Sequence, residues 1–238
     1  MVKLWRFGLT VMLSGIILSA GVLAGEGNVS IPVGTVLDYF PMQTGNQWAY
    51  EITSNGANIL IEYRVIDRFE TDGQTTAILE SKANGATRQT ETYRVKPEGI
   101  FTILRQAGNY QFAFTPHQCL LKYPVQVGGR WEQTGTFSDK AQNLTFTYQL
   151  KCKYEALQNL KVPAGLFKVM KVALVMDNSD GSHVQGYRYF SPGVGLVKED
   201  FYMTVNKTQR TTLVSVLKSY QIKNWSKVEK SKVEGQRF

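Results

Sequence analysis

Hydrophobic and polar residues alternate along most of this chain at the two-residue period of a β-strand. In residues 48–52, the side chains of Trp, Tyr and Ile alternate with those of Ala and Glu, a pattern typical of a strand with one buried face. Similar segments follow one another as far as residue 222, and no window from residue 46 onward shows a sustained helical period. Before them, residues 38–40 are predicted to form one helical turn that ends at Pro41.

Turn residues separate these segments. Asn55-Gly56, Asp72-Gly73 and Asn84-Gly85 each stand between two strand-like segments, and such dipeptides accept the positive φ angles of a tight hairpin. Among the strands we expect one over residues 110–114 and another over residues 144–155. The spacing predicts an all-β, antiparallel fold of roughly twelve strands in a barrel-like or strongly curved sheet.

An internal repeat divides the sequence. Residues 40–48 (FPMQTGNQW) and 123–131 (YPVQVGGRW) share the pattern aromatic-Pro-x-Gln-x-Gly-x-x-Trp at identical spacing. Residues 93–100 and 189–196 extend the match more weakly. We therefore expect two related halves in one domain, over about residues 38–116 and 121–222, that share one core because a lone small sheet is marginal. The residues of the repeated motif are Pro41, Gly45, Trp48, Pro124, Gly128 and Trp131.

The motif has a structural interpretation. Proline cannot take part in a central ladder, so it stops the incoming segment, and glycine allows the backbone to bend. The tryptophan then begins the strand with a large ring that can close the core at one end of the sheet. We favour this interpretation over a pair of ligand-binding tryptophans.

The amino terminus resembles a secretory signal peptide. Lys3 and Arg6 precede an apolar run over residues 7–23, and Val22 and Ala24 place small side chains before a cut at Gly25. The alternative is an uncleaved membrane anchor, since the run of ~17 residues is at the low end of a bilayer span. No cysteine follows the run, so we do not expect attachment through a lipid-modified cysteine. Residues 1–24 are therefore predicted to direct export.

The net charge of +8 is unevenly distributed. Removal of Lys3 and Arg6 leaves 25 basic against 19 acidic residues, or +6, and the tail over residues 223–238 holds five basic and two acidic residues, or +3. The β domain over residues 25–222 is left with about +3, which is no footprint for nucleic acid. We interpret the tail as a solvated end. Contact with a membrane surface is the weaker alternative.

Three segments resemble a known family. Residues 38–50, 162–168 and 189–197 are similar to secreted bacterial proteins of unknown function, some of which carry the label TapB-like. The resemblance covers most of the β domain, but its motifs are turns and strand starts. It implies an antiparallel β fold in the cell envelope or outside the cell, and it transfers no catalytic residue.

Cys119 and Cys152 are the only cysteines. Two cysteines exclude a disulfide-dense miniprotein and a four-thiolate zinc site. In an oxidising compartment the pair is a disulfide candidate, which would close a loop of about 33 residues and contribute about 3 kcal/mol. Two separate thiols are the alternative.

No catalytic or cofactor-binding motif stands out. The sequence lacks Gly-x-Ser-x-Gly and His-Glu-x-x-His, and two histidines do not suffice for a metal centre, so we expect no metal and no cofactor. The carboxylates of Glu91, Glu199 and Asp200 are candidates for the acid pair of a glycosidase. Adjacent strand residues face opposite sides, so Glu199 and Asp200 cannot act together, and charged strand residues are expected in solvent.

The sequence therefore predicts an exported, non-catalytic β protein, periplasmic or extracellular. One hypothesis is that it binds an apolar or amphipathic ligand within a curved sheet, because barrels of this size often enclose cavities. A second is a structural or assembly protein of the envelope that acts through a protein partner. The third is an enzyme whose site the sequence does not reveal.

Overall fold

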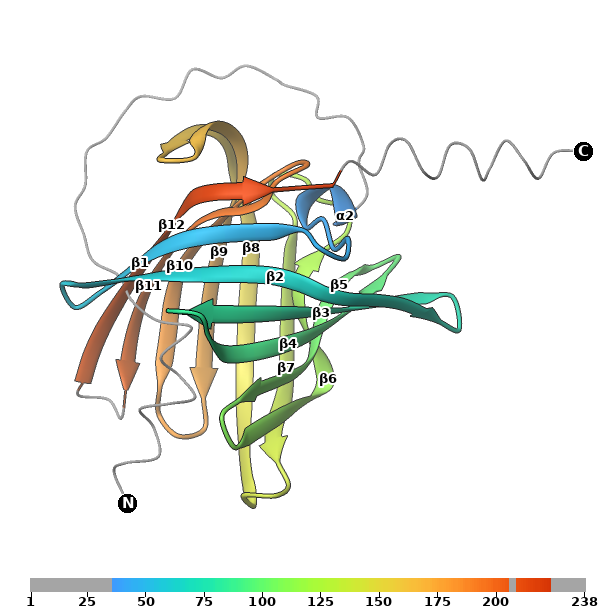
Figure 1. The fold of residues 1–238 in the computed structure, drawn as a ribbon. Helices are drawn as coiled ribbons and strands as arrows, with labels where there is room; N and C mark the ends of the chain where they lie inside the picture. The colour runs from blue at the N-terminus through green and yellow to red at the C-terminus, as the bar shows by residue number, and fades with distance from the viewer. Residues whose placement is uncertain (1–35, 206–208, 224–238) are drawn as a thin grey trace, which may run out of the picture.

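The described part of the protein is an antiparallel β-barrel of twelve strands with one short helix (Figure 1). The computed structural model describes residues 36–205 and 209–223. The elements are α2 (Val36–Tyr39), β1 (Gln47–Ser54), β2 (Ala57–Thr71), β3 (Gln74–Ala83), β4 (Ala86–Lys96), β5 (Gly99–Ala107), β6 (Tyr110–Lys122), β7 (Arg130–Asp139), β8 (Leu144–Val162), β9 (Gly165–Asn178), β10 (His183–Ser191), β11 (Gly195–Val205) and β12 (Gln209–Gln221).

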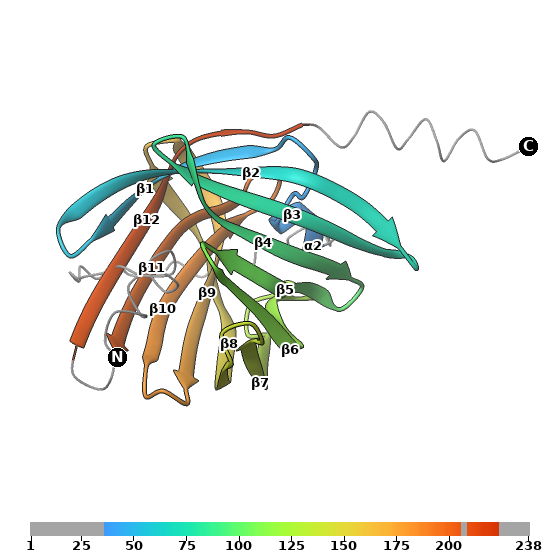
Figure 2. The ribbon, with the colours of Figure 1, turned by 60° about the horizontal axis from the view of Figure 1, so that its bottom comes forward.

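Each strand pairs with the next one along the chain, and β1 pairs with β12 to close the ring. The predicted all-β antiparallel fold is therefore confirmed, and it is a closed barrel rather than an open curved sheet. Figure 2 shows β4 and β5 on one side of the ring and β10 and β11 on the other. Strands that lie six positions apart in either direction thus face each other across the lumen.

The predicted hairpin turns are confirmed. Asn55, Asp72 and Asn84 have φ values of 47°, 53° and 52°, and the glycine after each is also positive. Both central residues of these two-residue loops thus have the positive φ of a type I′ turn, whose twist matches that of the flanking strands.

Two strands are longer than the sequence predicts. β6 continues through Pro116 to Lys122, because the proline lies in a stretch where the register with β5 shifts and no ladder bond is lost. β8 reaches Val162, since a bulge after Tyr154 lets pairing with β9 continue.

The two motif segments adopt the same turn. Gly45 and Gly128 have φ values of 89° and 88°. Residues 43–46 and 126–129 each close with a hydrogen bond of 3.0 Å from the N–H of the last residue to the carbonyl of the first. The shared conformation explains why both motif copies have glycine at this position, because L-residues rarely adopt this φ.

Both turns also dock on the neighbouring strand in the same way. The N–H groups of Gly45 and Gly128 donate to the carbonyls of Val65 and Tyr154, each at 2.8 Å. Val65 and Tyr154 in turn donate to the residue after each glycine, at 3.0 and 2.8 Å. One extra residue follows Val65 in β2 and Tyr154 in β8. β1 and β2 therefore correspond to β7 and β8 in hydrogen bonding as well as in sequence.

The helix α2 and the segment after it lie at one end of the barrel (Figure 1). The side chains of Tyr39, Phe40 and Met42 are buried in the core, and the carbonyl of Asp38 accepts a hydrogen bond from the N–H of Gly193 at 2.6 Å. The predicted helical turn is present here, one to two residues earlier than expected. This segment closes the end of the lumen next to the β10–β11 turn.

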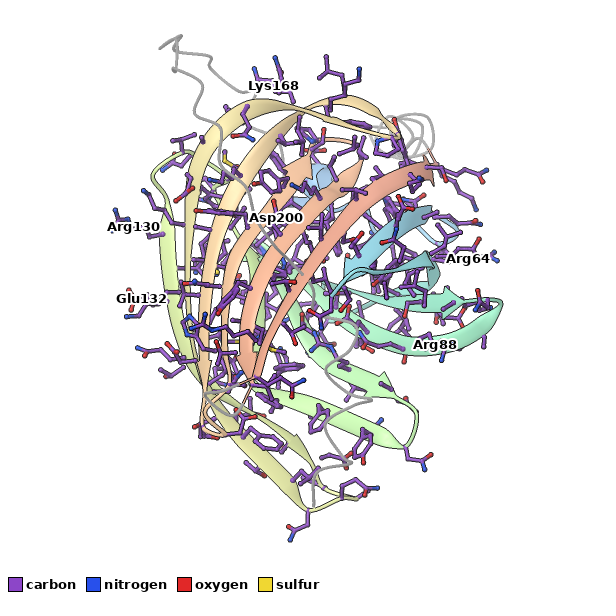
Figure 3. The ribbon with its side chains drawn as sticks, turned by 90° about the vertical axis from the view of Figure 1, so that its left-hand side faces the viewer. Arg64, Arg88, Arg130, Glu132, Lys168 and Asp200 are labelled. Carbon is purple, nitrogen blue, oxygen red and sulfur yellow. The ribbon has the colours of Figure 1, made fainter. Side chains whose placement is uncertain are left out.

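The outer face of the barrel carries exposed charged side chains. Arg64, Arg88, Arg130, Glu132 and Lys168 project away from the sheet (Figure 3). The predicted signal segment, its cleavage site and the basic tail beyond Lys223 lie outside the described residues. In the described part of the chain, no helix has the length and hydropathy needed to cross a membrane.

A first prediction concerns the repeated turn. Gly128→Ala should lower the free energy of unfolding by about 1 kcal/mol, because alanine is strained at positive φ and no atom lies near the added Cβ. Gly45→Ala should cost at least as much, since its Cβ would also meet the flexible Lys223 side chain. Denaturant titration followed by tryptophan fluorescence measures both.

The matched variant Gly128→Asn should cost less, because asparagine tolerates positive φ. The exposed neighbour Val127 provides a neutral control as Val127→Ala. Equal stability of Gly128→Ala and the wild type would contradict the role assigned to the turn.

Candidate functional site

A cavity with four charged side chains in its wall lies inside the barrel, within a lumen that is otherwise filled by apolar side chains. Residues of β1 to β6 and of β10 to β12 line it, so the cavity is surrounded by the closed sheet. Its volume is about 80 Å³. We refer to it as the lumen cavity, and its charged lining residues are Glu91, Arg105, Arg188 and Glu199.

The first ion pair joins β4 to β5. Nε and Nη2 of Arg105 both lie 2.7 Å from Oε1 of Glu91, and the hydroxyl of Tyr93 donates to Oε2 of the same carboxylate at 2.5 Å. Glu91 is only 8% exposed. Both of its oxygens are thus engaged by protein groups, as a buried carboxylate requires.

The second ion pair joins β10 to β11. Nε of Arg188 lies 2.9 Å from Oε1 of Glu199. Burial lowers the pKa of Arg188, and the adjacent carboxylate more than offsets this, so the pKa stands above its ordinary value. The two terminal nitrogens of Arg188 and Oε2 of Glu199 take no part in this hydrogen bond.

The two ion pairs occupy corresponding positions in the two halves. Glu91 is the cross-strand partner of Arg105, and Arg188 is the cross-strand partner of Glu199. In each hairpin, one further residue pair separates the ion pair from a shift in the strand register. The acid is on the first strand in β4–β5 and on the second strand in β10–β11. The charge order is therefore reversed between the halves, and the four charges sum to zero.

Tyrosine side chains surround the charges. Burial raises the pKa of Tyr63, and the carboxylates of Glu199 and Glu91 raise it further, so this ring is within electrostatic reach of both ion pairs. Burial likewise raises the pKa values of Tyr50 and Tyr93. The Tyr50 ring packs edge-on against Tyr63 at 5.5 Å. These hydroxyls stay protonated at neutral pH and act as neutral hydrogen-bonding groups.

One polar atom of the lining has no partner. Gln89 is 4% exposed, and its Oε1 accepts no hydrogen bond from the described residues. A buried acceptor without a partner costs about 1–3 kcal/mol. Such an atom in the wall of a cavity points to a water or a ligand that donates to it.

Phe40 covers the cavity from the segment that closes the barrel end. Its ring packs edge-on against Tyr93 at 5.4 Å and against Phe190 at 6.3 Å. Nearby, the indole N–H of Trp48 donates to the carbonyl of Val194 at 2.6 Å. The cover is thus tied to residues of both halves of the barrel.

The motif tryptophans differ in their surroundings. Trp48 lines the lumen cavity, whereas the Trp131 ring packs against Tyr154 at 4.9 Å and its indole N–H donates to the Cys119 carbonyl at 3.4 Å. Pro41 and Gly45 precede Trp48 at the closed end. Only one copy of the motif thus contributes an aromatic ring to the cavity.

The expected disulfide between Cys119 and Cys152 is not formed, and both cysteines are buried free thiols. Cys119 is on β6 and Cys152 on β8, with β7 between them. Two strand spacings amount to ~10 Å, more than the Cα separation of a disulfide allows. Burial raises the pKa of each thiol to about 12.

The expectation that charged strand residues are in solvent is wrong for Glu91 and Glu199, which line the lumen cavity. The prediction that Glu199 and Asp200 face opposite sides is confirmed, because Asp200 pairs with Lys198 at 2.6 Å and does not line the cavity. The signal that could have identified the site is the alternation Gln89-x-Glu91-x-Tyr93 in β4, once its inward phase is known.

We searched the described side chains for a set of metal ligands. Within residues 36–205 and 209–223, no group of three or more His, Cys, Asp or Glu side chains could hold a metal ion. Each lining carboxylate is already paired with a guanidinium. The charged side chains of the lining can donate hydrogen bonds to a ligand and accept hydrogen bonds from it, and their charges sum to zero.

These features define the protein as a closed twelve-stranded barrel with a charged cavity. Two crystal structures are similar to it. A protein from Bacteroides fragilis, described as exported and as having a YMCC-like fold, superposes with a TM-score of 0.54 at 16% identity, over 77% of this chain and 98% of that chain. A protein from Parabacteroides distasonis, described as a lipoprotein, superposes with a TM-score of 0.51 at 14% identity, with the same coverage.

At this identity the two structures show a shared fold. No family model and no curated protein sequence matches the chain. The resemblance to secreted β proteins thus agrees with the comparisons as far as the fold, and the TapB-like label is not confirmed.

A second prediction tests the thiols. In protein purified without reductant, Ellman's reagent should detect two thiols per chain in denaturant and none in the folded state, because burial raises their pKa values to about 12. Leu166→Cys, at a residue that is 70% exposed, should react at once and serves as the positive control. Absence of thiols in denaturant would contradict the structure and restore the disulfide.

A third prediction tests the ion pairs. Glu91→Gln should lower the free energy of unfolding by about 3 kcal/mol, since it leaves the Arg105 charge buried without a partner. Glu199→Gln should cost less, because its pair is held by one hydrogen bond. Urea titration gives both values.

The exposed Glu132 on β7 provides the matched control as Glu132→Gln, which should change stability by less than about 0.5 kcal/mol. A larger loss for Glu199→Gln than for Glu91→Gln would contradict the assignment of the tighter pair.

Proposed function

We propose that the protein is an exported, non-catalytic barrel that binds a small polar molecule in the lumen cavity. The observation that carries the proposal is the unpartnered Oε1 of Gln89 in a cavity lined by four charged side chains. Binding sites are enclosed spaces with a few polar groups placed to orient a ligand.

Export is supported by two findings. Residues 1–24 have the pattern of a signal peptide, and the two similar structures are described as an exported protein and a lipoprotein. Cys119 and Cys152 are the only cysteines and both are buried in the barrel, so neither suits lipid attachment.

The size and lining of the cavity select the ligand. A buried water needs about 10–15 Å³ of such a space, so about 80 Å³ holds several waters or one solute of a few heavy atoms. The apolar or amphipathic ligand expected from the sequence would meet apolar lining residues such as Leu79 and Leu120. An acyl chain would, however, also desolvate the charged groups without replacing their hydrogen bonds.

A hydrolytic reaction is less well supported, although Glu91 and Glu199 both line the cavity. Carboxylate pairs of glycosidases act as proton donor and base or nucleophile. Here one carboxylate binds Arg105 and Tyr93, and the other binds Arg188. Both carboxylates are thus engaged by guanidinium groups, and this pairing favours binding over catalysis.

A second candidate function is assembly with a protein partner in the envelope. β2 exposes the apolar side chains of Ile59, Leu60, Ile66 and Phe69, each 39–50% exposed. Large exposed apolar side chains can mark an interaction surface. A shift of purified protein to a larger species that Phe69→Glu abolishes would favour this function.

The binding proposal is tested by NMR titration of the full mature chain with a panel of small polar and apolar solutes. A ligand in the lumen cavity should shift the side-chain amide of Gln89 and the indole N–H of Trp48. The indole of Trp131 lies outside the cavity and should not move, which makes it an internal control. Failure of every solute to shift Trp48, or equal shifts of both indoles, would overturn the proposal.

A further inference from the structure

The charge balance of the lumen cavity limits which ligands it can hold. Its two guanidinium groups and two carboxylates are already paired. A ligand with a net charge would enter without a free counter-charge and would have to break one of the pairs, at the cost of leaving a buried charge uncompensated. A ligand without charge can hydrogen-bond to the pairs and leave them intact.

The two pairs are not equally available. Arg105 uses two nitrogens on one oxygen of Glu91, and Tyr93 occupies the other oxygen. Arg188 donates to Glu199 through Nε, and its terminal nitrogens take no part in that bond. The β10–β11 pair can therefore offer terminal N–H donors and a carboxylate oxygen to a ligand, whereas the β4–β5 pair acts as a closed unit.

Gln89 adds the third polar contact. Its unpartnered Oε1 requires a donor. The Arg188 guanidinium, whose Cζ lies 5.3 Å from the centre of the Phe201 ring, can donate from its terminal nitrogens to an acceptor. A hydroxyl group can donate to Gln89 and accept from Arg188, and Gln89, Arg188 and Glu199 all line the same cavity. The rings of Tyr50 and Tyr63 provide apolar wall for the carbon atoms of a molecule that carries such hydroxyls.

From these contacts we infer that the lumen cavity binds a small uncharged polyhydroxyl molecule. The inference rests on the proposed binding function and names its ligand class. Glycerol, with six heavy atoms, is the probe of suitable size. With so few atoms, its Kd is expected on the order of millimolar.

The experiment compares four probes by the NMR shifts of Gln89 and Trp48 in the full mature chain. Glycerol is the uncharged polyhydroxyl probe, glycine the zwitterion, acetate the anion and benzene the apolar probe. Glycerol should shift both resonances with saturation, and the other three should not. Binding of glycine, acetate or benzene in place of glycerol would overturn the ligand class and leave the proposed binding function standing.

A variant pair connects the signal to Gln89. Gln89→Met keeps a similar volume and removes the acceptor, so the Kd for glycerol should rise at least tenfold. Its melting temperature should not fall, because the acceptor that is removed has no partner in the described residues. Gln149→Met, at an exposed residue of β8, is the matched control and should leave the Kd unchanged.

The remaining outcomes are decisive as well. Glycerol binding that Gln89→Met does not weaken would overturn the assigned contact. If none of the four probes, and no solute of the wider panel, shifts Trp48, then the cavity holds only water and both the inference and the proposed function fail.

Discussion

The pairing of β1 with β12 is the constraint on which the rest of the structure depends. This contact joins the two ends of the described chain and turns a meander of hairpins into a closed ring. Closure pairs the first strand with the last, and it also takes most of the surface of the inward-facing side chains out of bulk water. A charged residue on the inner face then has to find its partner inside, which accounts for the Glu91–Arg105 and Arg188–Glu199 pairs.

The two copies of the repeated turn are alike in backbone, whereas the ion pairs of the β4–β5 and β10–β11 hairpins differ in charge order. The turns at Gly45 and Gly128 share their φ values and their bonds to the next strand, because these bonds depend on the backbone alone. The ion pairs take corresponding register positions with reversed charge order. A salt bridge depends on opposite charges and not on which strand holds the acid, so the halves can differ in this respect while they keep the same hairpin geometry.

The lumen cavity combines features that favour binding over catalysis. Its charges cancel, its tyrosines remain neutral, and Phe40 covers it from the closed end. The covering segment contacts Tyr93 and Phe190, one from each half, so the polar site lies where the halves meet. Replacement of a buried ion pair by well-packed apolar residues is often neutral or stabilising, so stability alone does not account for these charges. Their presence, together with the open acceptor of Gln89, is the physical basis for the proposed ligand site.

Features that depend on neighbouring residues were predictable from the sequence. Alternation and the dipeptides at Asn55, Asp72 and Asn84 predicted antiparallel hairpins, because a two-residue turn and a two-residue period depend on neighbouring residues alone. The side of the sheet on which a residue lies, and the distance between residues on separate strands, depend on the tertiary structure. Whether Glu91 faces solvent or the lumen depends on strand phase and ring closure, and Cys119 and Cys152 stay apart because β7 lies between their strands. These outcomes are set by residues distant in the chain, which the local pattern does not contain.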